Sequence, residues 1–184
     1  WAMQFSTPVT FPAPSRRILP GEKILVVGSC FSDSVGQRMA RCGLDVAVNP
    51  FGTLYNPVSI SNSLFRLDGG IPFREEECVQ MGAGTSLFCS FSHHTSFARP
   101  TAEEFLSAAN ASAMEASDFF RDCSTVIVTL GTAWCFFRGG EVVSNCLKRP
   151  ASEFERKMLS ADMVSSILKG MVRNLSCGGE RRFI

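Results

Sequence analysis

The sequence predicts an α/β domain with three layers, α/β/α, a mostly parallel sheet and hairpin insertions. Two apolar runs are the main observations: residues 24–27 read Ile-Leu-Val-Val, and residues 125–130 read Thr-Val-Ile-Val-Thr-Leu. Such runs are typical of strands buried on both faces of a parallel sheet. Segments with helical periodicity lie between the strands, as an α/β architecture requires. Ligands of these folds bind beyond the carboxyl ends of the strands.

The first strand leads into a tight turn and a helix. Gly28 ends the apolar run. The apolar residues that follow are spaced four, four and three positions apart, which predicts a helix with one apolar face made of Phe31, Val35, Met39 and Cys42. Ser29 therefore lies at the carboxyl end of a central strand and beside a helix amino terminus. Unpaired N–H groups and the helix dipole favour negative charge at that place.

Three interpretations of Ser29 follow from the residues. A helix cap is the simplest, because serine is a common N-cap residue. A phosphate-binding turn is the second, although Gly28 and Gly36 do not complete the three-glycine dinucleotide fingerprint. The third is a nucleophile whose alkoxide the helix terminus stabilises, although the Gly-x-Ser-x-Gly elbow of another hydrolase fold is absent.

The middle of the chain predicts a short strand, a helix and a hairpin. Residues 44–48 form the strand, which ends near the Ser29 turn if the sheet is parallel. Asn56 and Pro57 are a good cap and first position for a helix through about Leu67. Residues 71–97 contain two short apolar stretches around Gly82-Ala83-Gly84, which predicts a hairpin outside the main sheet.

The later elements follow from caps and turns. Thr101 and Glu104 have capping-box spacing for a helix to about Phe120. Gly139-Gly140 joins residues 134–138 and 141–145 as a second hairpin. A last helix is expected from a Ser160 cap to about Leu175. At the other end, four prolines in residues 1–22 predict an extended arm.

Composition indicates one soluble globular domain. The chain has 184 residues, of which 45% are hydrophobic and 19% charged, and its formal net charge is +1. This charge gives no reason to expect a nucleic-acid or membrane partner. Eight cysteines lack any C-x-x-C pair, so the sequence favours a reduced, cytoplasmic protein with no zinc site and no cofactor.

Several motifs resemble those of the GSCFA family, which is related to the SGNH (GDSL-like) hydrolases. They occur in the right order: Gly28-Ser29-Cys30-Phe31-Ser32, residues 49–57 (NPFGTLYNP), residues 92–97 (SHHTSF), residues 129–134 (TLGTAW) and residues 145–148 (NCLK). The resemblance implies a flavodoxin-like, SGNH-hydrolase-like fold in a single domain over residues 1–184. Family members continue into a block that carries a histidine, so we expect the domain to be truncated after Ile184.

The resemblance also implies roles for particular residues. Ser29 corresponds to the nucleophile, and Gly52 to a glycine whose N–H contributes to the oxyanion hole. The motif at residues 129–134 departs from the SGNH pattern, because Ala133 stands where SGNH enzymes have an asparagine. Either Asn145 replaces that asparagine, or the site has only two donors. On the residues alone, Gly52 is equally well a loop glycine and Asn145 a turn residue.

The catalytic base is the least defined part of the site. The two histidines are His93 and His94, and the resemblance implies that the usual catalytic histidine lies in the later block. His94 matches a family histidine and is expected to line the substrate pocket. Its alternative role is that of the catalytic base. His93 is expected to be structural, and a metal site shared by the pair is a minor alternative.

These observations predict an ester hydrolase that removes an acyl group from a carbohydrate or a small metabolite, with Ser29 as nucleophile. Two alternatives remain open from the sequence. One is a non-catalytic ligand- or carbohydrate-binding module on the same fold. The other is a phosphate- or nucleotide-binding domain that uses the turn at Gly28–Ser32. The oligomeric state is not indicated.

Overall fold

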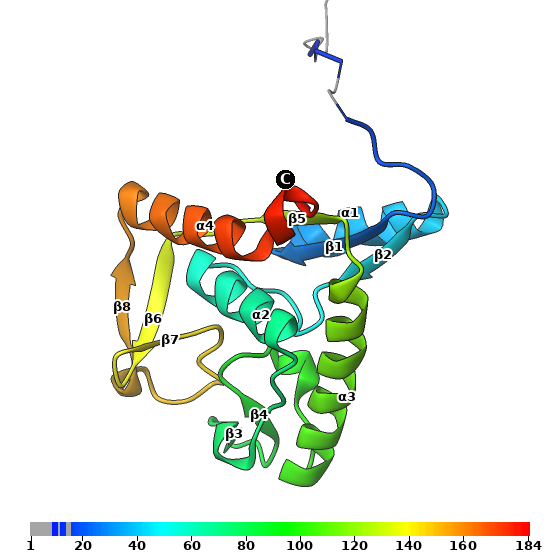
Figure 1. Ribbon diagram of the computed structural model, residues 1–184. Helices are drawn as coiled ribbons and strands as arrows, with labels where there is room; N and C mark the ends of the chain where they lie inside the picture. Colours follow the sequence, from blue (N-terminus) through cyan, green and yellow to red (C-terminus); the bar gives the residue numbers. More distant parts are fainter. Residues whose placement is uncertain (1–8, 11, 14–15) are drawn as a thin grey trace, which may run out of the picture.

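The computed structural model describes residues 9–10, 12–13 and 16–184. A parallel four-stranded sheet lies at its centre, in the order β2 (Asp45–Val48), β1 (Lys23–Gly28), β5 (Thr125–Thr129) and β9 (Arg182–Phe183). Figure 1 shows β1 and β2 side by side in the upper part of the fold. The predicted α/β class and mostly parallel sheet are therefore confirmed. Most of the expected N-terminal arm, residues 1–8, 11 and 14–15, lies outside the described residues.

Helices cover both faces of the sheet. Leu25 and Val27 belong to one core cluster with side chains of α2 (Pro57–Gly69), α3 (Ala102–Arg121) and α4 (Ala161–Leu175). Ile24 and Val26 alternate with them and are also fully buried. Because side chains alternate along a strand, these two face the opposite side, where α1 (Cys30–Arg41) contacts β1, β2 and β5. The result is three layers, as the sequence predicts.

The buried face of α1 differs from the prediction. The residues of α1 that are buried are Ser32 and Gly36, whereas Phe31 is 62% exposed. Gly36 lies directly against the side chain of Val48 in β2, and a Cβ atom there would collide with it. The helix therefore packs through small residues that allow close approach to the sheet, and the apolar series at Phe31 is not its core face.

Two antiparallel units extend from the central sheet. The predicted hairpin in residues 71–97 is β3 (Cys78–Gln80) paired with β4 (Phe88–Ser90), and it lies beside α3 (Figure 1). The second predicted hairpin is β6 (Trp134–Arg138) paired with β7 (Glu141–Val143). A third strand that the sequence analysis missed, β8 (Glu155–Met158), pairs with the other edge of β6. Short 3-10 turns at Glu75–Glu77, Thr95–Phe97, Ala151–Glu153 and Cys177–Gly179 complete the elements.

A buried arginine joins the ends of two helices. Arg181 is 5% exposed, and it donates to Phe120 O at the end of α3 (2.7 Å) and to Leu175 O at the end of α4 (2.9 Å). Its guanidinium also lies over the Phe120 ring, 3.8 Å from the centroid. Both acceptors are carbonyls in the last turns of their helices, where the regular helical bonds end. Arg181 therefore fixes α3 and α4 against the edge of the sheet.

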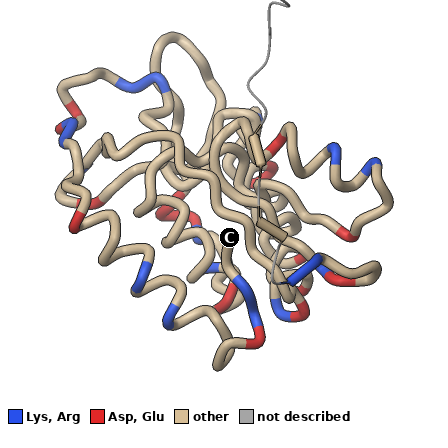
Figure 2. The backbone as a smooth tube through the Cα atoms, turned by 90° about the horizontal axis from the view of Figure 1, so that it is seen from above, with Lys and Arg blue, Asp and Glu red and all other residues tan. Residues whose placement is uncertain are grey.

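The surface carries both signs of charge. Acidic and basic residues are interspersed around the outside of the fold (Figure 2). Within the described part of the chain, no helix is both long enough and apolar enough to cross a membrane. All eight cysteines are free thiols, and burial raises the pKa of the Cys89 thiol to about 11.

Candidate functional site at the carboxyl edge of the sheet

Ser29 occupies the backbone position between β1 and α1, but its side chain does not cap the helix. Its φ and ψ of −69° and 178° are those of an N-cap residue, yet its hydroxyl accepts no bond from the first turn of α1. Instead, Ser29 Oγ lies 3.0 Å from Thr129 Oγ1, at the end of β5. The side chain is thus directed along the carboxyl edge of the sheet, and the sequence-based interpretation as a side-chain cap is wrong.

Three hydroxyl groups form a chain at this edge. Thr129 Oγ1 lies 3.0 Å from Ser29 Oγ and 2.8 Å from Ser32 Oγ, and it also accepts from the Ser29 N–H at 3.0 Å. A hydroxyl has one proton and two lone pairs. With one lone pair occupied by the Ser29 N–H, the Thr129 hydroxyl donates to one serine and accepts from the other. When Ser32 donates to Thr129 and Thr129 donates to Ser29, the Ser29 proton is left free for a base.

The turn before Ser29 is held by Asn49. The Asn49 side chain accepts from the Gly28 N–H at 2.8 Å and donates to Asp33 Oδ1 in α1 at 2.6 Å. Gly28 has a φ of 137°, and any Cβ atom there would collide with the Thr129 carbonyl oxygen. Only glycine fits this approach between the ends of β1 and β5. Asn49, Asp33 and Thr129 were not predicted to belong to the site, and Ser32 was named only as the end of the Gly28–Ser32 turn.

Gly52 and His94 lie side by side, as members of two different motifs. His94 N–H donates to Phe51 O at 2.9 Å, and a Cβ atom at Gly52 would collide with the Cβ of His94. The Gly52 N–H itself donates to Asn49 O at 2.8 Å. In this structure the N–H is therefore engaged within its own loop, and the role of Gly52 in an oxyanion hole stays a prediction.

The hydrogen bonds of His94 define its tautomer. Its Nδ1 accepts from the Ser96 N–H at 3.2 Å and lies 3.0 Å from Ser96 Oγ. A ring nitrogen that accepts from a backbone N–H carries no proton, so neutral His94 carries its proton on Nε2. In that form Nε2 is a donor. This arrangement suits contact with a ligand better than removal of the Ser29 proton.

His93 is a buried core residue. It is 0% exposed, its Nδ1 lies 2.7 Å from Ser90 Oγ, and its ring contacts those of Phe51, Phe73, Phe97 and Phe105. Burial, with a smaller effect of the Arg66 charge, lowers the pKa of His93 to about 3. Its Nε2 has no partner among the described residues. The structural role expected for His93 agrees with this environment.

The motif at residues 129–134 contacts the motif at residues 49–57, and Asn145 stays within its own turn. The N–H groups of Gly131 and Thr132 both donate to Tyr55 O, at 2.9 and 3.0 Å. Asn145 Oδ1 accepts from the Leu147 N–H at 2.8 Å, which is the bond of a turn residue. Its amide nitrogen keeps two donor hydrogens. The structure therefore supports the turn role, and a contribution to an oxyanion hole stays a prediction.

Comparison with protein-family models identifies the chain. The model of the GSCFA family matches residues 23–180, which include all the motifs described above. The chain belongs to the GSCFA family. Comparison with curated proteins and with solved structures gave no match. In this GSCFA chain, residues 16–184 contain no group of three or more His, Cys, Asp or Glu side chains that could hold a metal ion.

Gly52 and Gly43 form a matched pair for testing the contact with His94. Both have left-handed backbone, with φ of 80° and 83°, but nothing lies within 4 Å of a Cβ atom placed at Gly43. Gly43→Ala should lower the free energy of unfolding by about 1–2 kcal/mol through backbone strain alone. Gly52→Ala should lower it by about 1–3 kcal/mol more, because His94 must move. Urea unfolding measures both, and equal losses would contradict the contact.

The buried His93 makes stability depend on pH. Its pKa is about 3 in the folded protein and 6.5 when unfolded, so the unfolded chain binds the extra proton between these values. Protonation of the unfolded chain therefore lowers the free energy of unfolding as the pH falls below about 6.5. At pH 5.5 the loss is about 1.4 kcal/mol. His93→Phe should remove this fall, whereas His94→Asn should keep it. Urea unfolding at pH 7.5 and 5.5 tests this, and an unchanged fall in His93→Phe would refute it.

Proposed function

We propose that this GSCFA chain is a serine hydrolase that cleaves an acyl ester of a carbohydrate or small metabolite, with Ser29 as nucleophile. The observation that supports it is the position of the Ser29 hydroxyl, at the carboxyl end of β1, beside the start of α1 and hydrogen-bonded to Thr129 Oγ1. Family membership supports the same assignment. A hydroxyl already aligned by a donor needs only a base to become a nucleophile.

In the proposed reaction, Ser29 Oγ attacks the ester carbonyl carbon while a base takes the Ser29 proton. The alcohol then leaves with a proton, and water releases the acyl group from Ser29 in a second step. The base in this proposal is a histidine other than His93 and His94, and His94, with Nδ1 engaged by Ser96, is assigned to the substrate pocket. Thr129 positions Ser29 when its hydroxyl donates to Ser29 Oγ.

The proposed oxyanion donors require a rearrangement. The Ser29 N–H is shared between Thr129 O at 3.1 Å and Thr129 Oγ1 at 3.0 Å, and the Gly52 N–H donates to Asn49 O. Each N–H must exchange these acceptors for the substrate oxyanion if it contributes, and the Asn145 amide would be the third donor. The same observation favours the second candidate function, a non-catalytic ligand-binding module, because a binding protein needs no free oxyanion hole.

The third interpretation, a phosphate-binding turn, receives less support. A phosphate site needs N–H groups that point outward from the turn. Here the N–H groups of Gly28 and Ser29 are engaged by Asn49 and Thr129 inside the protein. Titration with inorganic phosphate, followed by the amide NMR shifts of Gly28 and Ser29, distinguishes this interpretation from the other two.

Labelling with a fluorophosphonate serine probe tests the proposed nucleophile. Ser29→Ala should abolish labelling, because the probe forms its bond with an activated serine oxygen. Ser34→Ala is the matched control, since Ser34 is an exposed serine in the first turns of α1, and it should label like the unchanged protein. His94→Ala should still label, in keeping with a pocket role; loss of labelling would make His94 the base. A protein extending beyond residue 184 that does not label at all would favour the binding module.

A further inference from the structure

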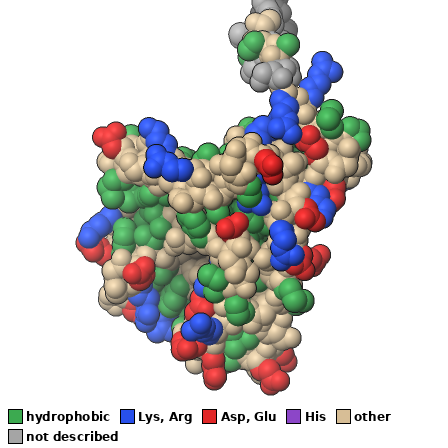
Figure 3. Space-filling view, viewed as in Figure 1, with side chains coloured by type: hydrophobic (Ala, Val, Ile, Leu, Met, Phe, Trp, Pro, Cys, Tyr) green, Lys and Arg blue, Asp and Glu red, His purple; other side chains and the backbone are tan. Residues whose placement is uncertain are grey.

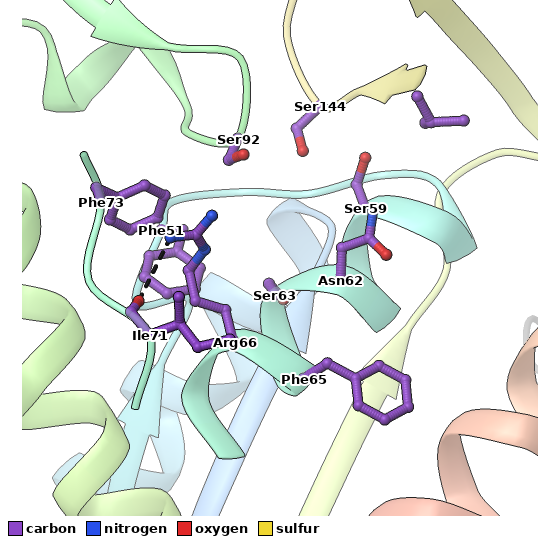
Figure 4. Close-up of a pocket in the computed structure, with 11 residues that line it drawn as sticks. Phe51, Ser59, Asn62, Ser63, Phe65, Arg66, Ile71, Phe73, Ser92 and Ser144 are labelled. Carbon is purple, nitrogen blue, oxygen red and sulfur yellow. Dashed lines mark hydrogen bonds between the residues drawn. The ribbon is translucent and has the colours of Figure 1, made fainter. Parts of the chain in front are cut away.

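A cavity lies between α2, the segment after it at residues 71–73, the loop after β4 and the end of β7. The space-filling view shows the depression in this face (Figure 3), and the close-up shows its lining (Figure 4). Its volume is about 310 Å³. Pockets of at least this size are typical of small-molecule sites. None of the residues assigned to the reaction lines it.

Polar groups from three separate elements converge on this cavity. Asn62 comes from α2, Ser92 from the loop after β4, and Ser144 from the segment after β7, and Figure 4 shows Ser92 and Ser144 across the cavity from α2. The Ser144 N–H donates to Phe91 O at 2.8 Å, and the Ser92 N–H donates to Ser90 Oγ at 3.2 Å. Backbone bonds thus hold the two serines next to each other and leave their hydroxyls available.

The buried side of α2 adds a fourth group. Ser59 is 4% exposed, and its Oγ accepts from the Asn56 amide at 2.9 Å, so its proton remains available to a ligand. Phe51 and Phe73 form an apolar floor in an edge-to-face pair, with centroids 5.4 Å apart. The cavity therefore combines hydroxyl and amide groups that both donate and accept with an apolar surface.

The one charged residue that lines the cavity is held in an ion pair. This residue, Arg66, pairs with Glu77 through both terminal nitrogens. Nη1 of Arg66 also donates to Pro72 O at 3.0 Å, and the guanidinium lies over the Phe73 ring, 3.9 Å from the centroid. Because these partners engage both terminal nitrogens of Arg66, its guanidinium is not free to form the paired hydrogen bonds by which arginine holds an anion.

We propose that this cavity binds a neutral polyhydroxylated ligand, the pyranose ring of a carbohydrate. Sugar hydroxyls donate and accept like the groups of Asn62, Ser92 and Ser144, and the C–H faces of the ring suit the apolar floor. The paired Arg66 favours neutral sugars over acidic ones. The site does not depend on chemistry at Ser29 and goes beyond the proposed reaction.

Ligand titrations followed by NMR test this site with neutral and charged probes of the same shape. Methyl glucoside, methyl galactoside and methyl mannoside are the neutral probes; glucuronate and glucose 6-phosphate are the charged ones. At least one neutral probe should bind with a Kd in the millimolar range and shift the amides of Asn62 and Ser144, more strongly than either charged probe. Absence of binding by all three neutral probes up to tens of millimolar, or preference for a charged probe, would overturn the proposal.

Variants locate the binding and separate it from the reaction. Asn62→Ala and Ser144→Ala should each weaken binding roughly 2- to 12-fold, as expected for one hydrogen bond. Asn174→Ala is the matched control, an exposed helical asparagine on α4, and should bind like the unchanged protein. Ser29→Ala should also bind normally, whether or not Ser29 labels. Equal affinities for Asn62→Ala, Ser144→Ala and Asn174→Ala would place the sugar elsewhere.

Discussion

The arrangement of the site depends on the side chain of Asn49. One amide group joins the last residue of β1, Gly28, to the first turn of α1 at Asp33, and it does so from the end of β2. Its backbone adds two bonds: its N–H donates to Val26 O, and its carbonyl accepts from the Gly52 N–H. Asn49 is 7% exposed, so these bonds are shielded from water and removing either partner would leave buried polar groups unsatisfied. Three elements that carry site residues are thus fixed relative to one another through a single residue.

Much of the fold could be predicted because its determinants are local. The predicted caps at Asn56, Thr101 and Ser160 are confirmed, and their side chains accept from the N–H groups of Ser59, Glu104 and Met163. The apolar runs that form β1 and β5 are likewise a property of neighbouring residues. The sequence analysis failed where distant segments decide the outcome. Helix α1 packs against the sheet through Gly36, which contacts Val48, and not through an apolar face that includes Phe31. Strand β8 pairs with β6, but all four of its residues are exposed, so its sequence does not show the alternation of apolar and polar residues that predicts a strand.

The site was only partly predictable for the same reason. The motifs around Ser29, Gly52 and His94 indicate chemistry by residue type, and the structure brings Gly52 and His94 together. Thr129 and Ser29 are separated by 100 residues, and nothing in either motif indicates that their hydroxyls meet. Asn49 opens the most specific motif of the chain, so its importance had a signal, but its partners at Gly28 and Asp33 emerge only when β1 and β2 pair in register.

In the proposed site the Thr129 hydroxyl aligns Ser29 for attack. The most direct measurement is the rate of fluorophosphonate labelling of Thr129→Ser beside Thr129→Val. The serine variant keeps the hydroxyl that lies 3.0 Å from Ser29 Oγ, and valine keeps the shape of threonine without it. Thr129→Ser should label at close to the unchanged rate, and Thr129→Val should label at least about tenfold more slowly, as expected for loss of one hydrogen bond at the nucleophile. Equal rates in folded samples of the two variants would contradict it.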